Sequence, residues 1–180
     1  MRKITCLLFT ATLLLFSSGA FSQSIYLFIK ALDNNGVMLN GGSIQPGHTN
    51  QIDGLSYSQG VANACDTCPQ GSDFTFMMSL NPATVGMRQM LLKGLHLQSL
   101  DVTYQKPGTS GTIDFYKMHM EDVRITSVQE SGSSEVPSVS VSVNPVREAW
   151  QFTATKSDGT AGARTKGGWD FSSDTEWSFY

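Results

Sequence analysis

The sequence predicts a mainly β protein with a single α-helix flanking its sheets. Two observations support this fold class. Apolar residues recur at every second position through most of the chain, which is the spacing of a strand with one buried face. Only one segment breaks that alternation, and it shows helical spacing between a helix start signal and a stop signal. We therefore expect sheets around one hydrophobic core, with one helix beside them.

Four stretches show the strand pattern clearly. Their alternate positions are mostly apolar, and most of the residues between them are small or polar, so each stretch is predicted to bury one face. The predicted buried positions are Leu55, Tyr57, Gln59 and Val61, then Phe74, Phe76, Met78 and Leu80, then Leu100, Val102 and Tyr104, and finally Val139, Val141 and Val143.

Two further strands depart from simple alternation. Residues 25–32 are apolar on both faces, so we expect this opening strand to be covered twice, once by the core and once by something else. In a later strand the apolar positions are even-numbered up to Met120 and odd-numbered from Val123. The intervening Glu121 and Asp122 therefore mark either a bulge or a change of strand.

Turn residues separate the predicted strands. The stretches QKPGTSG (105–111) and KSDGTAGARTKGG (156–168) are rich in Gly, Pro, Ser and Asp, and we expect both to be connections. The longest expected loop is residues 33–50, which we call the early loop.

The predicted helix lies between Asn81 and Gly94. Asn81 is a favourable N-cap, Pro82 suits the first helical position, and Gly94 suits the C-terminal cap. An apolar stripe at helical spacing includes several methionines, which occur both in core faces and in adaptable binding grooves. We favour a core face. The stripe consists of Ala83, Met87, Met90 and Leu91.

The first 22 residues are predicted to be a secretory signal peptide. Arg2 and Lys3 precede an uninterrupted apolar run over residues 4–16. Those 13 residues match the apolar part of a signal peptide, and they are fewer than the roughly 20 that span a bilayer. Small residues allow cleavage after Ala20 or after Ser22, and we favour the second site.

Composition limits the partners of the remaining domain, residues 23–180. Without Arg2 and Lys3 the chain has 10 Lys and Arg against 15 Asp and Glu, a formal net charge of −5. Nucleic acids and anionic membranes are bound through positive patches. The acidic balance and the lack of a Lys or Arg cluster argue against both partners, and no second long apolar run predicts a membrane span in the mature chain.

Cys65 and Cys68 form the most specific motif in the sequence, CDTCP. This spacing is typical of redox and zinc sites. A redox site, however, needs a helix start behind the first thiol, and a zinc site needs a second ligand pair; the sequence predicts neither. An even number of thiols in an oxidising compartment favours a small structural disulfide. Free thiols, or a redox or metal role, are the alternatives.

The sequence carries no other motif of a catalytic or metal-binding site. The sequence contains no nucleophile elbow, P-loop, dinucleotide fingerprint or His pair of metal-binding spacing. His48, His96 and His119 are scattered along the chain and are predicted to be surface or capping residues. Adjacent Glu121 and Asp122 point to opposite faces of a strand and cannot act as a pair on one substrate. We therefore predict no catalytic residue, no metal site and no cofactor.

Six short motifs in the C-terminal half occur in the order typical of a known family. The opening strand, the strand over residues 52–61 and the helix followed by His96 fall in the same order. On these residues the whole mature chain resembles the Hcp family, the tube protein of bacterial type VI secretion. The six motifs are Glu121-Asp122-Val123, Ser131-Gly132, Val139 to Val143, Glu148-Ala149-Trp150, Asp158-Gly159 and Gly168-Trp169-Asp170.

The resemblance implies a compact β-barrel of two antiparallel sheets with one flanking α-helix and no active site. It implies assembly into six-membered rings that stack into a hollow tube, with cargo effectors in the lumen. The expected partners are therefore other copies of this chain, as a homohexamer and possibly stacked rings, together with secretion-machine components or cargo effectors. Family members ordinarily lack a cleavable signal, so this chain is expected to be an exported variant in a Gram-negative bacterium, periplasmic or extracellular.

Three function classes follow. The favoured one is a non-enzymatic, self-assembling ring or tube subunit that is exported from the cytoplasm. The alternative is a secreted binding or adhesin-like module of the same fold, acting as a monomer or a single ring. An enzyme has the least support, and thiol–disulfide exchange at Cys65 and Cys68 is its only candidate chemistry. We expect the early loop and the opening strand at the subunit interface, and Trp150, Trp169 and Phe171 in the core.

Overall fold

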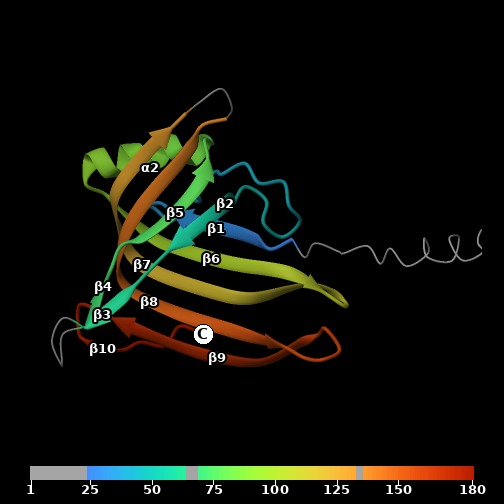
Figure 1. Ribbon diagram of the computed structural model, residues 1–180. Helices are drawn as coiled ribbons and strands as arrows, with labels where there is room; N and C mark the ends of the chain where they lie inside the picture. The colour runs from blue at the N-terminus through green and yellow to red at the C-terminus, as the bar shows by residue number, and fades with distance from the viewer. Residues whose placement is uncertain (1–23, 64–68, 133–135) are drawn as a thin grey trace, which may run out of the picture.

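The structure, a computed structural model, describes residues 24–63, 69–132 and 136–180 (Figure 1). This part of the chain holds ten strands and one helix. The elements are β1 Tyr26–Leu32, β2 Ile52–Ser58, β3 Val61–Asn63, β4 Pro69–Gly71, β5 Phe74–Ser79, α2 Pro82–Lys93, β6 His96–Gly108, β7 Gly111–Ser131, β8 Ser138–Thr155, β9 Ala161–Asp170 and β10 Thr175–Glu176.

Six of the strands close into a barrel. They follow the order β8-β5-β2-β1-β6-β7, and β7 pairs back onto β8. β9 and then β10 extend the wall beyond β8, while β3 and β4 form a separate two-stranded sheet. All of these pairings are antiparallel. Figure 1 shows α2 lying across one end of the barrel, where it contacts β7 and β6. The predicted mainly β barrel with one flanking helix is confirmed.

β8 holds the barrel and its extension together because it is long enough to pair with three strands. Its first part, from Ser138 to Val143, pairs with β5, and its second part, from Arg147 to Thr155, pairs with β9. β7 follows β8 along both parts. The outer wall over β6, β7, β8 and β9 is therefore one continuous surface.

The barrel interior contains most of the positions that the alternation predicted. Each apolar side chain moved out of water contributes about 1.5–3 kcal/mol. Leu80 is an exception, at 40% exposed, because it lies beyond the end of β5. Fully buried side chains (0% exposed) include Phe74, Phe76, Met78, Leu100, Met120, Val139, Val141 and Val143.

The predicted buried face of β2 is partly wrong. Leu55 is 61% exposed, whereas Tyr57 packs against the core. Val61, predicted on the same face, lies beyond β2 in the separate strand β3 and is 55% exposed. The register between β2 and β5 shifts between Gly54 and Ser56. One extra residue moves the following side chains to the opposite face, which strict alternation cannot anticipate.

Glu121 and Asp122 do not mark a change of strand, because β7 runs unbroken from Gly111 to Ser131. Asp122 has a φ of 49°, in the left-handed region. The buried face passes from Met120 to Val123 across this residue, and both of those side chains are fully buried at 0% exposed. The irregularity is therefore a local kink within one strand and not a bulge, because β7 keeps its register with β6 and β8 across it.

The helix begins and ends as predicted. The Asn81 side chain accepts a hydrogen bond from the Ala83 backbone N–H at 2.9 Å, and Gly94 ends the helix with a φ of 66°. Met87 is 0% exposed and Met90 is 5% exposed, both within the main core cluster. The methionine stripe is thus a core face, and the alternative of a binding groove is wrong.

The opening strand β1 is covered on both faces, as expected. Leu27 and Ile29 face the core, whereas Phe28, 3% exposed, points the other way. The ring of His48 from the early loop stacks on Phe28 with 3.8 Å between the ring centroids. The second cover is therefore the chain's own early loop.

The two predicted connections are shorter than expected because their ends belong to long hairpins. β6 and β7 leave only residues 109–110 between them, and β8 and β9 leave residues 156–160. The hairpin tips also meet, since the Thr109 hydroxyl donates to the Asp158 carbonyl at 2.6 Å. These hairpins supply the strands that carry the candidate site.

Candidate functional site

The candidate site lies on the outer face of the wall made by β6, β7, β8 and β9. Directly paired residues in neighbouring strands share a face of the sheet. The register therefore aligns outward side chains into rows that cross all four strands. The three rows are Ser99, Glu121, Arg147 and Asp170; Asp101, His119, Ala149 and Gly168; and Thr103, Lys117, Gln151 and Lys166.

The chain's last residues pass over the middle row, which we call the outer trough and define as Asp101, His119, Ala149 and Gly168. Its members on β8 and β9, Ala149 and Gly168, are small, whereas the rows on either side carry longer side chains at those strands. A strip of small residues between taller rows leaves space for an extended segment of chain.

His119 is the central polar group of the outer trough. Its Nδ1 lies 2.5 Å from Asp101 Oδ1, and its Nε2 lies 3.1 Å from Glu121 Oε1. Both ring nitrogens can donate at once only in the protonated imidazole. Burial opposes that charge, but the hydrogen bonds that the ring donates to Asp101 and Glu121 outweigh it and raise the pKa of His119 above its usual 6.5. The two carboxylates thus favour the protonated form of the His119 ring.

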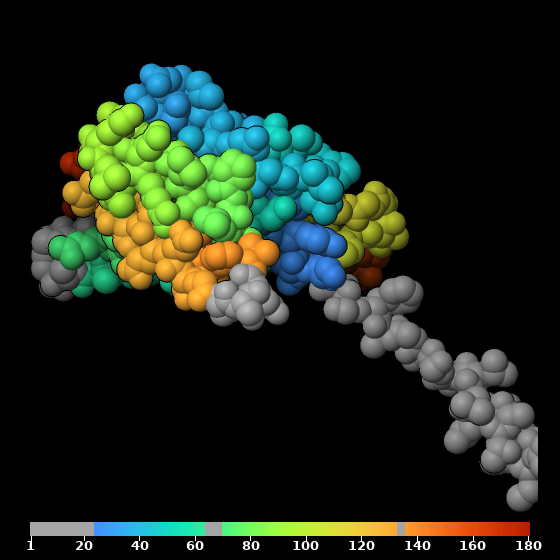
Figure 2. Space-filling view, turned by 90° about the horizontal axis from the view of Figure 1, so that it is seen from above, coloured from blue at the N-terminus to red at the C-terminus, as the bar shows by residue number. Residues whose placement is uncertain are grey.

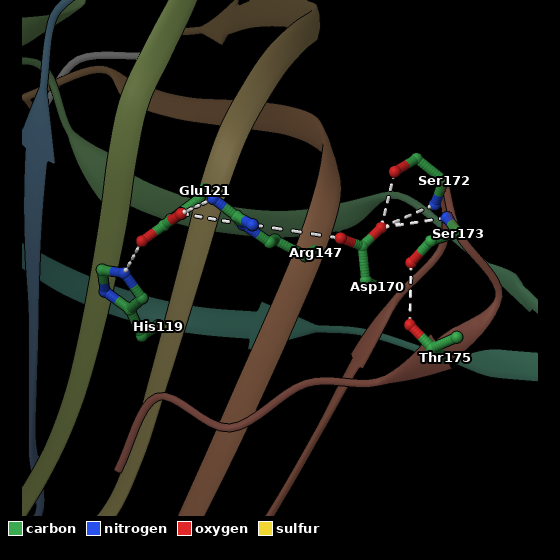
Figure 3. A network of polar contacts seen from close by, with 7 residues as sticks. All are labelled: His119, Glu121, Arg147, Asp170, Ser172, Ser173 and Thr175. Atoms are coloured by element: carbon green, nitrogen blue, oxygen red, sulfur yellow. Dashed lines mark hydrogen bonds and ion pairs between the residues drawn. The ribbon is translucent and has the colours of Figure 1, made fainter.

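An ion-pair network continues from His119 to the end of β9 (Figure 3). The Arg147 Nε donates to Glu121 Oε2 at 2.8 Å, and the Arg147 guanidinium lies 3.9 Å from Asp170 Oδ2. Asp170 Oδ1 then accepts from the Ser172 hydroxyl at 2.6 Å and from the Ser173 backbone N–H at 3.2 Å. The hydrogen bond from the Ser172 hydroxyl is the main cause that lowers the pKa of Asp170. This network fixes the turn that leads into the end of the chain.

The last four residues, Trp177–Tyr180, lie in the outer trough, and we call them the tail. The Phe179 ring stacks on His119 with 3.5 Å between centroids and an interplanar angle of 11°. The Arg147 guanidinium lies 5.0 Å from the centre of the Trp177 ring. Tyr180 is partly buried, and burial, then Asp101, raises the pKa of its phenol above the usual range. Three aromatic side chains therefore cover the polar row.

A second buried polar group lies inside the barrel. Glu148 is 1% exposed, and its Oε2 accepts a hydrogen bond from the Gln59 side chain. Within the described residues its Oε1 has no partner, and neither has Nε1 of Trp169, which is paired with Glu148 across β8 and β9. Burial raises the pKa of Glu148 to about 7.

The described residues offer binding groups rather than a recognisable reaction centre. No group of three or more His, Cys, Asp or Glu side chains in the described ranges could hold a metal ion. Over the same ranges, no helix is long and apolar enough to cross a bilayer. The chemistry that the outer trough supplies is ionic, hydrogen-bonding and aromatic, which suits recognition of another polypeptide segment.

The structure places several predicted residues differently from expectation. His119, predicted at the surface or as a cap, is 6% exposed. The side chain of His96, predicted in the same way, is 42% exposed and lies 2.6 Å from Asp122. Trp150 packs against the core as predicted, but Trp169 and Phe171 lie outside the main core cluster and are only partly buried.

The cysteine pair, Cys65 and Cys68, and the signal peptide, residues 1–22, lie outside the described residues. The sequence interpretation missed the roles of Asp101, Arg147 and the tail. The available signal was the cluster of three aromatic residues among the last four positions of the chain.

The described residues define a closed antiparallel β-barrel domain with one flanking helix. The family model described as "Type VI secretion system effector, Hcp" matches residues 26–156, which include all six barrel strands. The chain belongs to the Hcp family of type VI secretion. A comparison with curated proteins gave no match.

Solved structures of the family share the fold. Hcp1 from Salmonella typhimurium has a TM-score of 0.72 at 18% identity, over 86% of this chain and 99% of that one. A type six secretion system protein has a TM-score of 0.75 at 18% identity, over 86% and 100%. A type VI secretion system effector from Yersinia pestis has a TM-score of 0.65 at 22% identity, over 80% and 98%. At these identities the likeness establishes the barrel and its topology.

Proposed function

We propose that this chain is a self-assembling subunit that forms homohexameric rings, which stack into a tube of the type VI secretion kind. The observation that carries the proposal is the family match over residues 26–156, because it includes the whole closed barrel. The role is structural rather than catalytic, in keeping with that family. Closed rings need a heterologous contact in which one surface meets a different surface of the next copy.

The early loop is the surface best suited to such a contact. It is held in one shape by its own hydrogen bonds, including Ser43 N–H to Gln51 O at 3.0 Å and Gly41 N–H to Asn50 O at 2.8 Å. Ile44 on this loop is 88% exposed. Figure 2 shows the early loop projecting beside α2 on one face of the molecule. A rigid loop with an exposed apolar side chain can anchor in a neighbour at low entropic cost.

A matched pair of variants tests the assembly. Ile44→Glu should remove rings seen by negative-stain electron microscopy and lower the particle mass in solution, because it buries a charge in the contact. Leu92→Glu is the control, since Leu92 is 86% exposed but lies on α2. If the unaltered mature protein is monomeric and forms no rings, the assembly proposal is wrong, and a secreted binding module of the same fold takes its place.

Export completes the proposal. We propose that residues 1–22 direct the chain through the general export route and are then removed, and that Cys65 and Cys68 form a disulfide in the oxidising compartment beyond. Secretion itself is in keeping with the family. Sequencing the N-terminus of the protein recovered outside the cytoplasm checks the cleavage site, and mass spectrometry with and without reductant checks the disulfide. An intact Met1 would contradict removal of residues 1–22, and two free thiols would contradict the disulfide.

A further inference from the structure

We propose that the outer trough is a peptide-binding site for an aromatic C-terminal sequence, and that the tail of a second copy of this chain occupies it in trans. The peptide-binding part stands on the geometry of the described residues. The second-copy part rests on the proposed assembly, which would hold copies side by side.

The outer trough is shaped for a chain to pass over it. A Cβ on Gly168 would lie 2.4 Å from the carbonyl oxygen of Trp177 and 2.9 Å from that of Glu148. Both atoms belong to backbone, which cannot move aside cheaply. Glycine at this position therefore allows the tail backbone to approach, and the Trp177 N–H donates to the Gly168 carbonyl at 3.1 Å.

Charged groups are placed against the faces of the tail rings. The imidazole of His119 lies flat against Phe179, and the Arg147 guanidinium lies over Trp177. Aromatic faces attract cations, so each contact adds attraction beyond the apolar area that it covers. Asp101, Glu121 and Asp170 hold these two cations in position through the network of Figure 3 and the pairing of Asp101 with His119.

The contacts that define the site do not depend on the covalent link to the tail. They are made by residues 177–180, after β10, whereas the connecting turn is held by its own hydrogen bonds to Asp170. An identical segment from another molecule can therefore make the same contacts. A chain's own tail has the advantage of high effective concentration, so exchange requires neighbours held at comparable local concentration, as in a ring.

The bound tail leaves the site incompletely filled. Phe179 is 49% exposed, because the stack on His119 covers one side of its ring. A hollow of about 550 Å³, lined by His119, Glu121 and Arg147 among others, lies on one side of Phe179. A second hollow of about 510 Å³ is lined by the tail and by residues 166–169. A segment entering from a neighbour has room that the chain's own tail does not use.

The first experiment tests exchange in the full chain. A photoreactive benzoylphenylalanine replaces Phe179, and two differently tagged copies are mixed, assembled and irradiated. We expect cross-linked pairs that carry both tags, with the link mapped to residues around His119 and Gly168. The same probe at Leu92, which is 86% exposed on α2, is the control and should give no link to the outer trough. Links from position 179 that stay within one chain would overturn the second-copy part.

The second experiment tests the binding site without relying on exchange. The full chain carrying Trp177→Ala and Phe179→Ala should bind a synthetic peptide of residues 175–180 saturably, measured by fluorescence anisotropy of a dye on the peptide. Alanine in place of Phe179 in the peptide should weaken binding roughly fivefold, since it removes one aromatic contact. Alanine in place of the exposed Ser178 should leave binding unchanged. Peptide substitutions cannot unfold the protein, so absence of saturable binding overturns the site.

The two proposals can fail separately. If rings form but the cross-links from position 179 stay within one chain, the proposed assembly is supported and the exchange of tails is overturned. Saturable peptide binding by a chain that never forms rings supports the site and overturns the assembly, together with exchange between its copies.

Discussion

At the scale of single residues, the barrel holds an ionisable group where an apolar side chain would ordinarily lie. Glu148 is 1% exposed and is paired in register with Met120 and Trp169. Gln59 donates to one of its oxygens, whereas the other has no partner among the described residues. A carboxyl group in such surroundings is easier to hold neutral than charged, which is why burial raises its pKa to about 7.

Glu148 should make the protein less stable as the pH rises. Its pKa goes from the ordinary 4.5 to about 7 on folding. The folded state therefore binds the proton more tightly than the unfolded state. As the pH rises from 4.5 to about 7, the free energy of unfolding should fall by about 3 kcal/mol in all. Glu148→Gln should flatten this dependence. Urea unfolding of both proteins from pH 4.5 to pH 8 measures it.

The comparison between the two proteins isolates Glu148. The pKa of His119 is also raised, so its favourable contribution is likewise lost as the pH rises above 6.5 through the higher folded-state value. That contribution is common to wild type and Glu148→Gln. Parallel stability curves for the two proteins would show that Glu148 is not the cause.

At the scale of elements, the ends of α2 are set by local chemistry. Asn81 accepts from the Ala83 N–H, and the Asn81 N–H donates to the Thr84 hydroxyl at 3.4 Å. Asn81→Ala should therefore destabilise the protein by about 1 kcal/mol, measured by urea unfolding. Asn81→Asp keeps the acceptor and should stay near wild type, and Gln89→Ala on the exposed side of the helix is the neutral control. Equal losses for Asn81→Ala and Asn81→Asp would contradict a capping role.

The buried face of α2 tests the interpretation of its methionines. Met87 is 0% exposed, so Met87→Ala should cost about 2–5 kcal/mol through lost burial and the cavity left behind. Leu92→Ala, at 86% exposed, should change the free energy of unfolding by less than about 0.5 kcal/mol. Thermal or urea unfolding of the two variants measures this difference in stability. A small effect of Met87→Ala would mean that the stripe is not part of the core.

Sequence reasoning predicted those elements whose signals are local. The caps Asn81 and Gly94 and the alternation of Val139, Val141 and Val143 act within a few residues, and the structure confirms them. The exposed Leu55 could not be predicted, because a register shift depends on the neighbouring strand. His119 is buried by residues about sixty positions further along the chain, so its role depends on contacts that periodicity does not encode.

At the scale of the whole molecule, closure of the barrel leaves most strands paired on both sides. β7 lies between β6 and β8, and β8 pairs with β5, β7 and β9. β9 is different, because β10 pairs only with Trp169 and Asp170. Gly168 accepts a hydrogen bond from the Trp177 N–H. The rest of β9, residues 161–167, therefore presents an edge on which alternate amides point away from β8.

This edge predicts an uneven pattern of hydrogen exchange. In the dispersed, single-chain protein the amides of β7 and β8 should exchange slowest, because they open only with the barrel, whereas residues 161–167 should exchange much faster. Exchange followed by mass spectrometry of peptic fragments measures both. Slow exchange over residues 161–167 in the dispersed protein would contradict an open edge. Protection of these residues only when rings form would place the edge of β9 in the contact between copies, next to the outer trough that the tail occupies.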